Sequence, residues 1–306
     1  MADRRRINGP PGTTIPPVFE EGPDQGLQAR SYFRTRPDHV PRKMCRFKPS
    51  TQGHSNNTIL DLKTGVTPSA SGSAYLEMDL PGGDGPSGLK LSCTVHGPRS
   101  LPRSSPFSPH IILSTHVKFA PFATRQRRGY LRDSAERDLG THLEAALRGA
   151  IIADRWPKSG VDIIISIVEG DQDREVSKAQ GEESWDMMNA LSGCITVASA
   201  ALADAGIDCV DTVAGGVAAL VGEGEDAVEE VPRIVIDPIP SEHGKIYAAC
   251  CVAYLPTRDE ITNLWFKGDL PDNDAGLYLH LMNNGIKASK QANQVLVDCL
   301  GETVGS

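Results

Sequence analysis

SGCITVASAALADAGI, residues 192–207, is a run of small and mostly apolar residues whose one charged side chain is Asp204. A run of this kind fits two structures. It can be a tightly packed core helix, or a helix whose N-terminus closes around a phosphate. In both cases Gly206 is suited to the left-handed conformation that ends a helix. We therefore predict a helix that ends at this glycine, and we look to its surroundings to decide its role.

Strands are predicted on the N-terminal side of this helix. Short, partly alternating apolar runs are separated there by Gly, Pro and Ser, which is typical of antiparallel strands in a meander; these runs are 59–66, 72–80, 88–97 and 110–122. Leu139, Leu143 and Leu147 then recur at helical spacing, and Asp133 with Glu136 resembles a capping pair at the start of that helix. The nearly continuous apolar run 161–170 predicts a strand that is buried on both faces.

The C-terminal part predicts more strands and a long last helix. The strand runs are 210–222, 233–238, 246–255 and 261–268, and the helix covers 276–300. The segments 169–187 and 222–231 are acidic and predict loops. Because strands cluster instead of alternating with helices, the order favours an α+β fold with antiparallel or mixed sheets and packed helices. We expect one domain over 59–301, preceded by an extended, partly disordered N-terminal arm over 1–58.

Composition narrows the class of protein. The chain has 306 residues and a net charge of -8, so any contact with a nucleic acid needs a local basic patch. Its 7 cysteines include no CxxC pair and lie mostly in apolar runs, which favours buried free thiols. No histidine or cysteine cluster has metal-ligand spacing, and we expect neither a metal nor a cofactor. No secretory or membrane-spanning segment is expected.

Two basic segments are candidate binding sites. The first is the cluster Arg4, Arg5 and Arg6 in the arm, which is either a solvated tail or a segment that docks onto a neighbouring subunit or an RNA backbone. The second holds four arginines just before the predicted helix: Arg125, Arg127, Arg128 and Arg132. These can bind phosphates in a bidentate way, or they can pair with the acidic loops on a hydrated surface.

Several motifs together resemble the RNase PH-like family. GSAYLE (72–77), LKLSCTVHGPR (89–99), FAPF (119–122), WPKSGVDIII (156–165) and CITVASAALADAGIDCVD (194–211) occur in the order found in that family. The runs DRRRINGP and WPKSGVDI look most like one branch, a ring subunit of fungal RNA exosomes. The resemblance implies an RNase PH-like fold of the ribosomal-protein-S5-domain-2 type, a six-membered ring of such subunits, and cap subunits of the S1/KH type.

The resemblance also implies which positions form the active site in active members of the family. Active members use phosphate to cleave RNA from its 3′ end, and a Gly-Gly-Thr-Arg segment before the helix holds that phosphate. Here those positions read Met188, Asn189, Ala190 and Leu191, so the arginine position is a leucine. The two catalytic aspartate positions correspond to His243 and Ala249, although Asp237 and Glu242 lie close enough in sequence for a shifted register to supply one carboxylate. Arg99 of the Gly-Pro-Arg motif is retained, and it either keeps a structural pairing role or contacts RNA that passes through the ring.

We therefore expect a non-catalytic structural subunit of the RNA exosome core ring. It would help to close the ring, seat a cap subunit and line the RNA path with Arg99 and the arginines of 125–132. It would support 3′-to-5′ RNA processing and degradation in the nucleus, nucleolus and cytoplasm. Two alternatives stay open, an active phosphate-dependent 3′-to-5′ exoribonuclease and a freestanding RNA-binding module.

Overall fold

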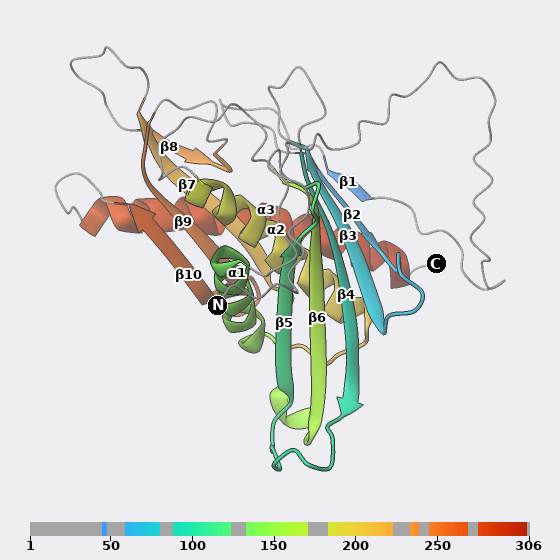
Figure 1. Cartoon of the computed structure of the whole chain (residues 1–306). Coiled ribbons are helices and arrows are strands. Elements are labelled where there is room, and N and C mark those ends of the chain that lie inside the picture. The colour runs from blue at the N-terminus through green and yellow to red at the C-terminus, as the bar shows by residue number, and fades with distance from the viewer. Residues whose placement is uncertain are drawn as a thin grey trace, which may run out of the picture.

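The computed structural model describes residues 45–47, 59–79, 88–123, 133–170, 183–222, 233–238, 245–268 and 275–304. Within these residues the chain forms two sheets and three α-helices (Figure 1). The strands are β1 (Cys45–Phe47), β2 (Ile59–Thr64), β3 (Gly72–Asp79), β4 (Gly88–Ser100), β5 (Ile112–Phe119), β6 (Ser159–Glu169), β7 (Ala214–Gly222), β8 (Arg233–Ile236), β9 (Lys245–Leu255) and β10 (Glu260–Gly268). The helices are α1 (Ser134–Arg148), α2 (Glu183–Asp204), α3 (Ala275–Val304) and the short 3₁₀ helix η1 (Ala153–Arg155).

The first sheet has the strand order β1-β2-β3-β4-β6-β5. All neighbours are antiparallel except β5 and β6, which are parallel and joined through α1. The predicted meander therefore holds for β2, β3 and β4 only, because β6 separates β5 from β4. The prediction that β6 is buried on both faces is wrong, since its residues alternate and Ile164 is 39% exposed.

The second sheet, β10-β9-β7-β8, is antiparallel throughout. Its central strand β7 is buried along its whole length. Gly215 and Gly216 face opposite sides of this strand: a Cβ on Gly215 would overlap Ser192 of α2, and a Cβ on Gly216 would overlap Ser289 and Gly285 of α3. The two helices therefore cover opposite faces of β7 at backbone contact distance.

Helix α2 lies between the two sheets. One side approaches β3 so closely that a Cβ on Gly72 would overlap Ala201 and Ala205, while the other side meets β7 at Gly215. The small side chains of α2 permit both contacts. Because both sides of the helix are buried against a sheet, the run 192–207 is almost free of charged residues. Met187–Asp204 is also long and apolar enough to cross a membrane, but it is 89% buried inside the fold, as expected of a core helix.

The predicted start of α1 and the predicted end of α2 are confirmed, but α3 continues past residue 300, where its end was predicted, to Val304, because Gly301 does not take the positive φ that ends a helix. Asp133 and Glu136 form a capping box at the start of α1. At the end of α2, Gly206 has φ +69, its N–H donates to Ala203 O, and the N–H of Ile207 donates to Leu202 O. This pattern is a Schellman motif. The α+β class and the order of strands and helices are confirmed as well.

Other predictions fall partly or wholly outside the described residues. The arm over 1–58 does so apart from β1, and so do 171–182 and 223–231 within the two acidic segments. Where the first acidic segment is described, it differs from the predicted loop, because Glu169 ends β6 and residues 183–187 are already helical. Among the cysteines whose side chains the structure describes, six are free thiols, and five of these are buried: Cys93, Cys194, Cys250, Cys251 and Cys299.

Candidate functional site

The positions that would grip phosphate lie inside α2. The helix begins at Glu183, so Met188–Leu191 fall in its second turn and not in a loop before it. The unbonded N–H groups of a helix belong to its first four residues, and residues 188–191 come after these. All four of these residues are buried, and Met188 and Leu191 are completely so. This place offers an anion neither a cation nor free amide groups.

Hydrogen bonding around these residues is internal to the fold. The Asn189 side chain is buried, and its Nδ2 donates to Pro238 O at 2.8 Å. The neighbouring Asp237 has φ +48, and its N–H donates to Val217 O at 3.0 Å. These bonds attach the segment after β8 to α2 and β7. The buried amide of Asn189 therefore holds α2 and the segment after β8 together.

The described catalytic-acid position is apolar as well. Ala249 lies in β9, is buried, and pairs with Ala219 of β7 and Lys267 of β10. The other acid position, His243, lies outside the described residues, as does Glu242. Asp237 is half-buried at the end of β8. Ala249 thus places a methyl group inside a buried strand, at the position where the family resemblance implies an aspartate.

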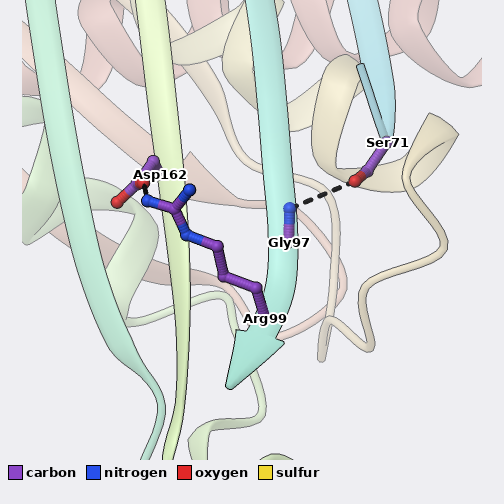
Figure 2. Close-up of polar contacts among 4 residues, drawn as sticks. All are labelled: Ser71, Gly97, Arg99 and Asp162. Carbon is purple, nitrogen blue, oxygen red and sulfur yellow. Dashed lines mark hydrogen bonds and ion pairs between the residues drawn. The ribbon is translucent and has the colours of Figure 1, made fainter. Parts of the chain in front are cut away.

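Arg99 is paired with Asp162. Arg99 lies near the end of β4, its side chain is 66% exposed, and its Nη2 donates to the Asp162 carboxylate of β6 (Figure 2). Just before it, the N–H of Gly97 donates to Ser71 Oγ at 3.1 Å (Figure 2). The register of β4 on β6 is irregular between His96 and Arg99, and this irregularity lets the guanidinium reach back along β6. An exposed pair of this kind contributes at most about 1 kcal/mol to stability.

The structural pairing of Arg99 was one of the two roles open to it from sequence. Its partner Asp162 was missed, although an aspartate at the start of the apolar run 161–170 was a visible signal. The remaining predicted site residues lie outside the described part of the chain: Arg4, Arg5, Arg6, Arg125, Arg127, Arg128 and Arg132. Within the described part, no group of three or more His, Cys, Asp and Glu side chains could hold a metal ion.

Comparison with known proteins gives the family. Residues 59–208 match the 3′ exoribonuclease family, domain 1. The exosome complex component MTR3 of Chaetomium thermophilum is 70% identical over 305 residues, which cover 100% of each chain. The exosome complex component MTR3 of Homo sapiens is 25% identical over 87% of this chain and 84% of its own. The solved structure of rice Rrp46 has a TM-score of 0.57 at 15% identity, covers 85% of this chain and 96% of its own, and supports the fold.

The fold and the matched residues define the class: the chain belongs to the 3′ exoribonuclease, or RNase PH-like, family. Within that family it is similar over its whole length to the exosome complex component MTR3 of Chaetomium thermophilum, and over most of its length to the MTR3 components of Schizosaccharomyces pombe and Homo sapiens. The RNase PH-like fold expected from the motifs is confirmed.

Proposed function

We propose that this chain is a non-catalytic structural subunit of the RNA exosome core ring, which supports 3′-to-5′ RNA processing and degradation. The observation that carries the proposal is the full-length likeness to an exosome complex component, at 70% identity. The buried Leu191 at the phosphate-binding arginine position supports the non-catalytic part.

Chemistry gives the reason for a lost activity. Phosphorolysis needs cations to hold the phosphate nucleophile and carboxylates near the leaving oxygen. Leu191 can supply no charge, and Ala249 can supply no carboxylate. A leucine and an alanine inside a packed core also leave no room for an anion with its hydration shell. These two positions contribute packing free energy in place of transition-state stabilisation.

Sheet edges are the surfaces that best suit contacts with ring neighbours. β10 is an edge strand of the second sheet, and it exposes the apolar side chains Ile261 and Leu264. An exposed edge with apolar side chains is a liability in a monomer, and it is suited to association. We propose that β10 contributes to a contact with another RNase PH-like subunit.

Further roles are proposed for the basic residues. Arg99 and the arginines of 125–132 would line the RNA path, while Arg4, Arg5 and Arg6 would dock the N-terminal arm onto a partner. S1/KH-type subunits would cap the ring. A subunit that supports RNA processing and degradation would be found in the nucleus, nucleolus and cytoplasm.

Phosphate-dependent cleavage tests the non-catalytic part of this proposal. The purified chain and the complex it forms are each incubated with single-stranded RNA, with and without inorganic phosphate, and nucleoside diphosphate release is measured. We expect no phosphate-dependent release of nucleoside diphosphates from the chain alone. If the complex releases nucleoside diphosphates, the Leu191→Met substitution in this chain should leave that release unchanged. Release by the chain alone that requires phosphate would establish the exoribonuclease alternative.

The freestanding RNA-binding alternative predicts something different. The monomer alone would bind RNA with an affinity that falls steeply with salt, and substitution of Arg125, Arg127 and Arg128 by Ala would abolish it. We expect RNA contact only within the assembled ring. Salt-dependent binding of the isolated chain, measured by fluorescence anisotropy, decides between them.

A further inference from the structure

Two segments lie together at the end of the first sheet that carries Arg99 (Figure 1). They are residues 101–111, which join β4 to β5, and residues 153–158, which include η1. We name this surface the tip. Three backbone hydrogen bonds join its two segments: Leu101 N–H to Lys158 O at 3.1 Å, Lys158 N–H to Ser108 O at 3.0 Å, and Ile111 N–H to Ala153 O at 3.0 Å. They fix the first residue and the last four residues of 101–111, and they leave 102–107 without a bond to 153–158.

We propose that Ser105 is a phosphorylation site for a proline-directed serine kinase. The full sequence holds three Ser-Pro or Thr-Pro dipeptides: Thr67-Pro68, Ser105-Pro106 and Ser108-Pro109. A residue before proline is disfavoured in the helical region and favours extended backbone. Extended backbone is the form in which a kinase active site holds its substrate. The structure separates the three dipeptides by how firmly each is held.

Two of the three serine or threonine residues are engaged. The Ser108 hydroxyl donates to His110 O at 2.7 Å, and its carbonyl accepts from Lys158 N–H. Thr67 lies in the turn between β2 and β3, where its N–H donates to Ser73 Oγ at 2.8 Å and its carbonyl accepts from Ala70 N–H at 3.2 Å. Binding of either residue in extended form in a kinase active site requires these bonds to break.

Ser105 is held far more loosely. Its N–H donates to Pro102 O at 3.0 Å, which closes one local turn, and its hydroxyl has no hydrogen-bond partner among the described residues. The neighbouring Phe107 is 73% exposed, Pro102, Arg103 and Pro106 are exposed, and Ser105 itself is half-buried. Since no residue of 102–107 is buried, this segment can leave the surface at little free-energy cost. A kinase could therefore bind it without unfolding the sheet.

Charge around Ser105 suits a phosphate. Residues 99–111 and 153–162 together hold four Arg or Lys and two Asp, an excess of two positive charges in a chain whose net charge is -8. Arg99 pairs with Asp162, but Arg103 and Lys158 are exposed and have no ion pair with a described residue. A phosphoserine carries about -1.5 to -2 charges at pH 7 and forms charge-assisted hydrogen bonds with such cations. Phosphorylation would thus bring the charge of this end close to zero.

The reaction is ordinary phosphoryl transfer from ATP. The Ser105 oxygen forms a bond to the γ-phosphorus, the bond between that phosphorus and the β–γ bridging oxygen breaks, and ADP leaves. The hydroxyl proton passes to the kinase's catalytic aspartate. The site itself does not depend on the proposed function. One consequence of phosphorylation does depend on the proposed function: if the tip faces RNA, the added negative charge would lower the affinity of the ring for RNA.

The test uses the full chain with ATP and a proline-directed kinase of the cyclin-dependent class, and phosphopeptide mass spectrometry locates the phosphate. The free peptide 99–111 serves as the unfolded reference. We expect both serines to be labelled in the peptide and Ser105 alone in the folded chain. Ser105→Ala should lower the initial rate of incorporation at least tenfold, while Ser108→Ala and Thr67→Ala should change it less than twofold.

Three results would overturn the site: Ser108 or Thr67 labelled in the folded chain as fast as Ser105, Ser105 labelled in the peptide but not in the folded chain, or Ser105 labelled in neither. The RNA affinity of the ring with phosphorylated chain is measured separately. An unchanged affinity there would count against RNA contact at the tip, and it would leave the phosphorylation site intact.

Discussion

At the scale of single residues, two positions that the family resemblance assigns to an active site are apolar and buried. Leu191 is completely buried in α2, and Ala249 is buried in β9. The polar residue that remains, Asn189, is used to hold Pro238 at 2.8 Å. Because these side chains belong to the core, a single charged substitution here would destabilise the fold.

Leu191→Arg tests this point. The substitution places an unpaired charge in the core, which costs about 3–5 kcal/mol. Leu191→Met, which keeps the volume, should cost less than about 1.5 kcal/mol. Urea unfolding measures both variants, and the phosphate-dependent release assay should detect no product from either. An arginine variant with wild-type stability that releases nucleoside diphosphates would contradict the account.

Buried thiols make stability depend on pH in the alkaline range. Burial raises the pKa of the Cys194 thiol to about 12, from an ordinary value of 9.0. Above about pH 9 the unfolded chain loses this proton while the folded chain keeps it, so stability falls as pH rises towards 12. Each such thiol contributes a slope of about 1.4 kcal/mol per pH unit.

Urea unfolding of Cys194→Ala between pH 8 and pH 10.5 checks this prediction. The variant should lose that share of the slope above pH 9. Thr196→Val, a buried neighbour without a titrating group, should shift the stability at every pH and keep the slope. An unchanged slope in the cysteine variant would show that the thiol is not protected by burial.

At the scale of elements, α2, β7 and α3 pack with their backbones in close contact. Gly215 and Gly216 let two helices touch opposite faces of one strand. A methyl group at Gly216 would meet backbone atoms of α3, which cannot give way as a flexible side chain can. The position of α3 over the second sheet therefore depends on this glycine.

Gly216→Ala should destabilise the fold by about 1–3 kcal/mol through overpacking. Gly301→Ala is the matched control. Gly301 lies in α3, the helix that Gly216 contacts, and a Cβ at Gly301 meets no atom within 4 Å. That control should stabilise α3 by up to about 1 kcal/mol, since alanine favours helix. Equal thermal midpoints for the two variants would mean that the close contact between β7 and α3 does not contribute to stability.

Much of this fold could be predicted from local signals. Gly206 and the Asp133–Glu136 pair marked helix ends because capping depends on neighbours in sequence. The start of α2 could not be found this way, because residues 183–191 become helical through packing between the two sheets. For the same reason β6 was misjudged: its apolar run did not reveal that Ile164 lies on an exposed face. The Arg99–Asp162 pair depends on the register between β4 and β6, which a sequence pattern leaves open.

At the scale of the whole molecule, exposed edges indicate a chain that works in an assembly. Leu264 on β10 is 45% exposed and belongs to an edge strand. Leu264→Glu should lower the recovery of partner subunits at least tenfold, because it places a charge in an apolar contact. The thermal midpoint of the isolated chain should barely move, as for other surface changes of about 0.5 kcal/mol or less.

Gln291→Glu adds the same charge at an exposed position of α3 and serves as the control. It should leave the recovery of partners unchanged. Equal recovery with both variants would remove β10 from the proposed contact with a ring neighbour, and it would leave the fold and the buried site as described.

Purification of the tagged chain from its native cells, with identification of stoichiometric partners, tests the central claim most directly. We expect the chain to elute in an assembly many times larger than itself, together with other RNase PH-like proteins and S1/KH-type proteins. Elution as a single chain or as copies of itself alone, with none of these proteins, would contradict it.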